Sequence, residues 1–160
     1  MMLYTQNDLQ MIQRQKRQRI FLMLIPALVL LAGVIASLAI RVMWLTIVLT
    51  ALLGAELIAC QDLLIRPLTN YEKHLKNMLH GRTREVEGAF SRISEDITEV
   101  DGVDFHAVLL IEYDEKGRPY DRLVYFDAMK EFPEVQPGEQ LRLLVHDKAI
   151  VSLSKGTPSP

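Results

Sequence analysis

Two long apolar runs dominate the pattern of hydrophobic and polar positions along the chain. Residues 20–40 carry no charged side chain, and residues 42–61 carry only Glu56. At about 1.5 Å per residue, each run makes a helix of roughly 30 Å, which is the thickness of the hydrocarbon core of a bilayer. One helix over both runs would be about twice that length. The pattern therefore predicts a transmembrane helical hairpin over residues 20–61, with spans of about 20–40 and 42–61.

The turn of the predicted hairpin lies at Arg41. A charge at the bilayer centre costs at least about 2.5 kcal/mol, whereas the same charge at the interface costs little. Trp44 follows closely, and its amphipathic ring favours the level of the lipid headgroups. Both residues indicate that the chain reaches a membrane surface here and turns back.

Basic residues flank the hairpin at both ends. The lead-in over residues 1–19 ends in a cluster made of Arg14, Lys16, Arg17 and Arg19. Arg66, Lys73 and Lys76 follow the second span. Because segments rich in Lys and Arg stay in the cytoplasm, this distribution predicts two spans with both termini cytoplasmic. Binding of anionic lipid is the alternative interpretation of the lead-in cluster.

Small residues recur along both spans. They are Ala32, Gly33 and Ala36 in the first span, and Ala51, Ala55 and Ala59 in the second. Such faces let helix backbones approach closely in lipid, so we expect the two spans to pack through them. Association between copies of the chain, or with another membrane protein, is the alternative.

Glu56 is the one charged residue within the apolar part of either span. It lies about 7 Å along the helix axis from the end of the second span, so its side chain can reach the interface. The plain interpretation is a snorkelling or hydrogen-bonded carboxylate. The functional interpretation is an intramembrane contact with a partner helix, or an ion site.

After the spans, the period of the apolar positions is first helical and then two. Leu68, Tyr71, Leu75 and Met78 form a helical stripe, which predicts an amphipathic juxtamembrane helix over residues 62–81. Alternating runs then predict five strands, at 83–93, 103–113, 120–126, 140–146 and 149–153. These strands form one small domain over residues 82–153, followed by a flexible tail over 154–160.

The alternation also predicts which side chains point into the core. Those expected to point inward include Phe105, Leu109, Ile111, Leu141, Leu143 and Val145. The outward side of the second and third strands then combines apolar and polar groups and is the candidate partner-binding surface. Its residues are His106, Val108, Leu110, Asp121, Leu123 and Tyr125.

Closing five short strands into a barrel removes the unpaired edges of the sheet. The order of three strands, a linking element and two strands is that of an OB-type barrel, with an SH3-like barrel as the close alternative. Residues 135–153 combine a Pro-Gly pair, an alternating strand, a tight turn and a second strand. Together with the preceding spans, this segment resembles NfeD-like membrane proteins. That resemblance implies transmembrane helices followed by a small OB-type barrel.

Charge separates the two halves of the chain. Residues 1–80 carry 8 Lys and Arg against 4 Asp and Glu, a net +4, whereas residues 81–160 carry 10 against 16, a net −6. Affinity for nucleic acid depends on clustered Lys and Arg, so we expect no nucleic-acid partner. A protein partner with a basic or mixed surface fits the acidic half.

Motifs for catalysis or cofactor binding are missing from the sequence. The four histidines have no metal-site spacing, and Cys60 is the single cysteine. No glycine-rich phosphate loop and no nucleophile elbow occurs. We therefore expect no metal, no cofactor and no enzymatic activity, and an acid/His site on the barrel is the enzymatic alternative.

The sequence thus predicts an integral membrane protein that presents a small cytosolic barrel as a binding or scaffolding module. Its expected partners are the lipid bilayer and another protein, in the membrane or in the cytosol, with a homo-oligomer as a further option. An accessory subunit of a membrane transporter or complex is a variant of this hypothesis, supported by Glu56.

Overall fold

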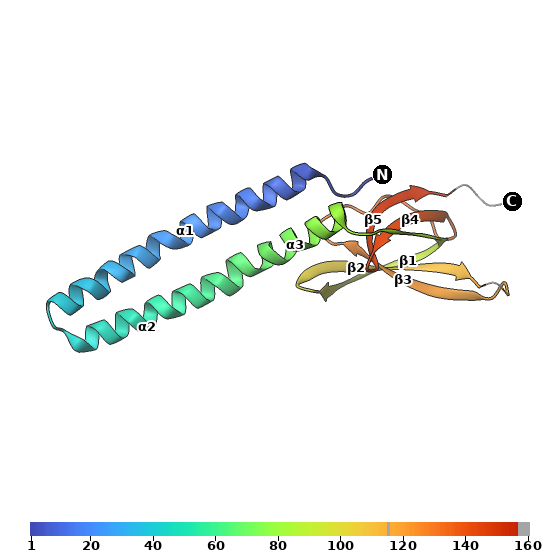
Figure 1. Cartoon of the computed structure of the whole chain (residues 1–160). Coiled ribbons are helices and arrows are strands. Elements are labelled where there is room, and N and C mark those ends of the chain that lie inside the picture. Colours follow the sequence, from blue (N-terminus) through green and yellow to red (C-terminus); the bar gives the residue numbers. More distant parts are fainter. Residues whose placement is uncertain (115, 157–160) are drawn as a thin grey trace. The chain divides into compact units, whose positions relative to one another are not determined.

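The computed structural model describes residues 1–114 and 116–156. The chain divides into two compact units (Figure 1). One unit comprises residues 10–72 and is helical, whereas the other joins residues 1–9 to the chain from Lys73 onward and contains the β-strands. The sequence predicted that residues 1–19 are separate from the strands. In the structure, residues 1–9 belong to the unit that contains the strands.

The helical hairpin consists of α1 (Gln6–Ala39) and α2 (Met43–Cys60), which run side by side in Figure 1. Arg41 lies in the turn between them, at the predicted position, with a left-handed backbone φ of 59°. Among the described residues, two helices are long and apolar enough to cross a membrane, beginning at Gln6 and at Met43.

α1 begins well before the predicted span because its polar first turns are capped. The backbone nitrogen of Thr5 donates to Oδ2 of Asp8 at 2.9 Å, and the backbone nitrogen of Asp8 donates to Oγ1 of Thr5 at 3.3 Å. This reciprocal pair is a capping box, which satisfies backbone donors that the first helical turn leaves free. The lead-in is therefore mostly part of α1.

The second helix continues beyond the predicted span without a break. α2 passes through a π-helical turn, η1 (Gln61–Ile65), into α3 (Arg66–His80). Pro67 lacks a backbone N–H and cannot donate to the residue four positions before it. The π-turn, closed by a bond from the Arg66 nitrogen to the Gln61 carbonyl, widens the helix just ahead of this proline. The juxtamembrane helix is thus the end of the second helix.

The strands form a closed barrel, which confirms the predicted fold class of a helical pair with a small barrel. They are β1 (Arg84–Val100), β2 (Val103–Tyr113), β3 (Pro119–Asp127), β4 (Gln140–His146) and β5 (Ala149–Lys155). Within the described residues the order around the barrel is β1-β2-β3-β5-β4. Neighbouring strands are antiparallel except for β3 and β5, which meet in parallel at Tyr125 and Ala149.

β1 is longer than the predicted strand at 83–93, because the polar residues 94–100 continue it. Register shifts between Phe90 and Arg92 and between Ile93 and Ile97 interrupt the alternation, which is why the pattern of apolar residues ended early. Asp101 and Gly102 then turn the chain with φ of 54° and 73°, as a two-residue hairpin requires. At the other end of the chain, β5 runs to Lys155, so the predicted tail starts later, and residues 157–160 lie outside the described part.

The first residues of the chain add a short strand to β5, which the sequence did not predict. The Leu3 nitrogen donates to the Val151 carbonyl at 3.1 Å, and the Leu153 nitrogen donates to the Met1 carbonyl at 3.1 Å. Leu3 and Tyr4 are buried as a result. We refer to residues 1–4 as the N-terminal strap.

The barrel core contains the expected side chains of β4 but the opposite face of β2. Leu141, Leu143 and Val145 are buried as predicted. On β2, however, Val108 and Leu110 have no exposed surface, and they pair with the inner positions Val124 and Arg122 of β3. The predicted inward residues Phe105, Leu109 and Ile111 point to the outer face. Both faces of β2 are apolar, so a period of two could not decide between them.

Candidate functional site

The exposed side of β2 and β3 forms a mixed apolar surface, defined here as the outer β2–β3 face by Leu109, Ile111, Asp121, Leu123 and Tyr125. The register places Leu109 opposite Leu123 and Ile111 opposite Asp121. Leu123 is 38% exposed and Asp121 is exposed, whereas the other three side chains are partly covered. Adjacent apolar side chains on a partly solvated sheet can bind another protein surface.

The structure divides the predicted partner-binding residues between two faces. Asp121, Leu123 and Tyr125 lie on the outer β2–β3 face as expected. Val108 and Leu110 belong to the core, so their prediction as surface residues is wrong. His106 lies on the same inner side of β2, half-buried, and its Nδ1 atom is 3.1 Å from the Ser94 carbonyl oxygen. These three residues therefore do not contribute to an outer surface.

One end of the outer face is covered by α3 and the N-terminal strap. Phe105 is buried, and its ring meets the ring of His74 edge-on at 5.2 Å between centroids. His74 in turn contacts the Tyr4 ring edge-on, and 3.1 Å separates its Nε2 atom from the Tyr4 hydroxyl oxygen. Burial lowers the pKa of His74 below its usual value. The sequence offered one signal for this junction, the apolar pair Leu3-Tyr4 just ahead of a helix cap.

An ion pair secures the same junction. Nζ of Lys130 lies 3.2 Å from Oδ2 of Asp8 and 5.8 Å from the centroid of the Tyr4 ring. Burial raises the pKa of Asp8, but its hydrogen bonds with Thr5 and Lys130 outweigh that effect, so the pKa lies below its usual value. The beginning of α1 is thus held to the loop that follows β3.

A polar cluster lies among inner positions of β2 and β3. The Nη1 atom of Arg122 donates to both carboxylate oxygens of Glu112, at 2.9 and 2.8 Å, and the Tyr120 hydroxyl also donates to this carboxylate. Glu112 is buried. The hydrogen bond to Glu112 raises the pKa of Tyr120. Because a guanidinium pairs with the buried carboxylate, we interpret this cluster as a structural ion pair.

The two helices of the hairpin pack through other residues than the predicted alanines. The Ser37 hydroxyl lies 2.8 Å from the Thr46 hydroxyl, and Gly33 faces Leu49, whose Cδ1 atom would be 3.3 Å from an added Cβ. Ala27 and Ser37 are buried. Gly33 is therefore the one member of the predicted small-residue set that lies in the contact.

The remaining small residues lie on the outside of the pair, so the expectation that the two spans pack through them is wrong. Those that are exposed are Ala32, Ala36, Ala51, Ala55 and Ala59. Helices turn about 100° per residue, so Ala32 and Ala36, each one position before Gly33 and Ser37, are rotated by that angle from the two contact residues. The alternative, that these faces contact another copy of the chain or another membrane protein, stays a prediction.

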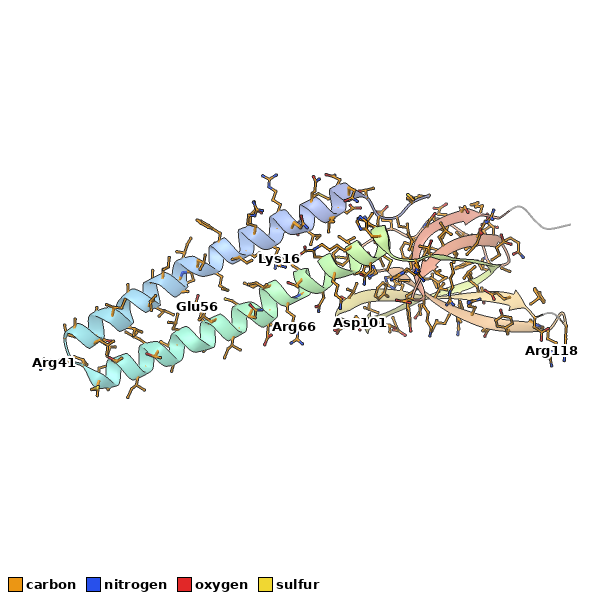
Figure 2. All side chains as sticks on the ribbon, in the orientation of Figure 1. Lys16, Arg41, Glu56, Arg66, Asp101 and Arg118 are labelled. Atoms are coloured by element: carbon orange, nitrogen blue, oxygen red, sulfur yellow. The ribbon has the colours of Figure 1, made fainter. Side chains whose placement is uncertain are left out.

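Glu56 faces the inside of the hairpin. Both of its carboxylate oxygens are buried, and neither has a hydrogen-bond partner among the described residues. Figure 2 labels Glu56 along the hairpin, between Arg41 in the turn and Lys16 on α1. A snorkelling side chain would expose its oxygens, so the plain interpretation from the sequence does not describe this position.

Most of the residues predicted to set the topology are exposed, and Lys16 forms an ion pair. Arg14, Arg17 and Arg19 are exposed on α1, and Arg41 and Trp44 are exposed at the turn. Lys16 instead pairs with Glu72 on α3, with 3.0 Å between Nζ and Oε2, and Gln13 donates to the same carboxylate at 3.2 Å. The helices thus stay paired beyond their apolar parts.

Neither a metal site nor a similar protein indicates a function for this chain. Within residues 1–114 and 116–156, no group of three or more His, Cys, Asp or Glu side chains could hold a metal ion. Comparison of the chain with family models, with curated proteins and with solved structures gives no match.

Proposed function

We propose that this chain is an integral membrane protein that presents its barrel at the cytoplasmic membrane surface as a binding or scaffolding module. The observation that carries the proposal is that two apolar helices leave one compact unit and return to it. Residues 1–9 and the chain from Lys73 onward belong to the same unit, and the two apolar helices lie between them.

This arrangement supports a topology with two membrane spans. Since the N-terminal strap is paired with β5, the start of α1 and the end of α3 must be on the same side of any membrane that the helices cross. Two crossings satisfy that requirement, and one crossing does not. The basic residues Arg14, Arg17 and Arg19 then favour the cytoplasm for this side.

The outer β2–β3 face is the surface that we propose for partner binding. It is apolar at Leu109, Ile111 and Leu123, and acidic at Asp121. The net charge of −6 over residues 81–160 favours a protein partner with a basic or mixed surface, and disfavours nucleic acid. We also propose that the barrel acts without enzymatic activity, in line with the lack of catalytic motifs in the sequence.

We further propose that the barrel is of the OB type. The support is the strand order β1-β2-β3-β5-β4 with a parallel contact between β3 and β5. This order, following two apolar helices, is compatible with the resemblance of residues 135–153 to NfeD-like proteins.

A second candidate function is that of a subunit in a larger membrane complex. The exposed alanines at positions 51, 55 and 59 of α2 favour it, because small residues on a lipid-facing surface allow close approach of another helix. In this case the membrane part, and not the barrel, would supply the main contact.

Cysteine accessibility tests the topology. Cys60 is replaced by Ser, and single cysteines are introduced as Ile40→Cys in the hairpin turn or Arg118→Cys in the β2–β3 turn. A membrane-impermeant thiol reagent added to intact cells should label Ile40→Cys, and should label Arg118→Cys only after the cells are permeabilised. Labelling of both positions in intact cells would rule out a cytoplasmic barrel.

Site-specific photo-crosslinking in native membranes tests the binding surface. A photoreactive amino acid at Leu123 should give a discrete crosslinked product. The matched control is Met129, which is also exposed but lies outside the outer β2–β3 face. Equal products from Leu123 and Met129, or none from Leu123, would argue against this face. A product only from a photoreactive amino acid at Ala55 would favour the second candidate function.

A further inference from the structure

A basic cavity lies where the link from α3 to β1 meets the turn between β4 and β5. Its volume is about 420 Å³, and it is lined by Arg82, Thr83, Arg84, Val145, Asp147 and Lys148. Sites for small molecules typically have volumes of about 300–1,000 Å³, so this cavity can hold an organic ligand.

The link that carries Arg82 and Arg84 is fixed on β4. The Nδ1 atom of His146 lies 2.8 Å from the Arg82 carbonyl oxygen, which can only accept a hydrogen bond. Gly81 allows this contact, because a Cβ atom there would lie 2.3 Å from the Asn77 carbonyl oxygen and 2.5 Å from Cε1 of His146. Arg84 is then held opposite Val145 by the pairing of β1 with β4.

The turn that carries Lys148 is equally fixed. Asp147 and Lys148 both have positive φ, of 45° and 73°, which is the conformation of a tight two-residue hairpin. The Lys148 carbonyl oxygen accepts a hydrogen bond from the Tyr125 nitrogen at 2.8 Å. The backbones of all three cationic residues are therefore positioned before any ligand arrives, which reduces the entropy cost of binding.

These cations are also not neutralised by the protein. In this acidic half of the chain, several cationic side chains pair with carboxylates, namely Arg118, Arg122, Arg142 and Lys155. Among the described residues, no such ion pair involves Arg82, Arg84 or Lys148. Asp147, the acid at the cavity, is 94% exposed in its side chain and lies 3.4 Å from Nε2 of His146.

From this geometry we infer that the cavity is a binding site for a phosphate-bearing ligand. Two guanidinium groups can each donate a pair of hydrogen bonds to phosphate oxygens, and the Lys148 ammonium adds a point charge. The hydroxyl of Thr83 is a further donor. The phosphate group belongs either to a soluble phosphorylated compound or to a phospholipid headgroup. This inference does not depend on the proposed partner-binding face.

Titration calorimetry on the full chain tests the inference. The protein is placed in nanodiscs of phosphatidylcholine, and inorganic pyrophosphate is the probe. Wild type should show saturable binding, and Arg84→Gln or Lys148→Gln should each weaken it about tenfold, the effect of removing one charged hydrogen-bond donor. The control Arg118→Gln, which removes an exposed cation remote from the cavity in sequence, should leave the affinity unchanged. Equal weakening by the control, or no saturable binding of pyrophosphate by the wild type, would overturn the site.

Lysine acetylation followed by mass spectrometry locates the ligand and identifies its source. Pyrophosphate should protect Lys148 from acetylation, with the exposed Lys116 as an internal reference. A second set of nanodiscs contains phosphatidylglycerol and no pyrophosphate. Protection of Lys148 in that set identifies a lipid headgroup, and protection by pyrophosphate alone identifies a soluble ligand. Unprotected Lys148 in both sets would refute the inference.

Discussion

Most of the fully buried side chains in the barrel unit are large and apolar, such as Leu110, Phe126 and Leu143, and Asp127 is the charged one among them. The buried residues described in α1 and α2 of the hairpin are instead Ala27 and Ser37. The large apolar residues of α1 and α2 face outward instead, as Phe21 and Leu28 do. The barrel can thus gain free energy by removing apolar surface from water, but two helices in lipid gain little that way. The hairpin depends on close approach at Gly33 and on the hydroxyl pair of Ser37 and Thr46.

The two regions also treat a buried carboxylate differently. Glu112 in the barrel has Arg122 and Tyr120 as partners, whereas Glu56 in the hairpin has no hydrogen-bond partner among the described residues. A buried charge needs such partners because transfer out of water costs several kcal/mol per ion. The burial of Glu112 is therefore explained by its partners in the barrel. Glu56 is the position in the hairpin where a group from another molecule could bind the carboxylate.

The largest effect is expected from truncation of a barrel core residue. Phe126→Ala should destabilise the barrel by about 3–5 kcal/mol, because it leaves a cavity where a fully buried ring packs against the ring of Phe132. The matched hairpin variant is Phe21→Ala, which removes the same atoms from an exposed position. Thermal unfolding of the full chain in detergent, followed by circular dichroism, measures both. Similar losses for the two variants would contradict the contrast between the regions.

Removal of the guanidinium that pairs with Glu112 should have the next largest effect. Arg122→Ala leaves a carboxylate buried without its counter-ion, which should cost about 2–3 kcal/mol, below the full penalty because Arg122 is partly exposed. The double variant Glu112→Gln with Arg122→Met should recover part of the loss, since no unpaired charge is left. Chemical unfolding of the barrel signal measures these changes, and a neutral effect of Arg122→Ala would show that the pair carries no structural role.

In the hairpin, a larger side chain at the helix contact should be destabilising, as truncation of a core side chain is in the barrel. Gly33→Leu forces a side chain against Leu49 and should cost about 1–3 kcal/mol of helix pairing. Ala55→Leu, on the exposed side of α2, should leave the pairing intact. Unfolding in increasing sodium dodecyl sulfate, followed through the helical signal, measures the difference. Should Ala55→Leu loosen the hairpin as much as Gly33→Leu, the packing described above would be wrong.

The smallest effect concerns pH and the junction of the barrel with the N-terminal strap. Burial lowers the pKa of His74 in the folded protein from the ordinary 6.5, so the unfolded chain takes up the proton more readily. The contribution of neutral His74 to the free energy of unfolding is therefore fully present above about pH 6.5. It declines as the pH falls from there towards the lowered pKa of the folded state.

Urea unfolding at a series of pH values measures this decline. His74→Gln should reduce the slope of stability against pH in this range, while Tyr4→Phe should retain it, because the buried imidazole is still present. The charged and titratable groups around His74 are Tyr4, Asp127 and His146. An unchanged slope in His74→Gln would assign the pH dependence to another group.

Much of the architecture could be read from local pattern. The length of the apolar runs predicted two helices with a turn at Arg41, and alternation predicted a small barrel with Leu141, Leu143 and Val145 inside. These features depend on the fit between residue spacing and a helix or strand, which neighbouring residues determine by themselves. The continuity of α2 with α3 was missed because the apolar run ends at residue 61, whereas the helix continues through a π-turn and past Pro67.

The candidate sites depended more on contacts between distant segments. Which face of β2 points inward was decided by pairing with β3 and by the cover that His74 and Tyr4 place over Phe105. The pairing of the N-terminal strap with β5 joins residues about 150 positions apart, and no local period encodes such a contact. Likewise, Arg82, Arg84 and Lys148 meet at one cavity only because β1, β4 and the β4–β5 turn are neighbours in the closed barrel. Spacing along the chain thus determined the elements, whereas the choice of faces and partners required the folded barrel to bring them together.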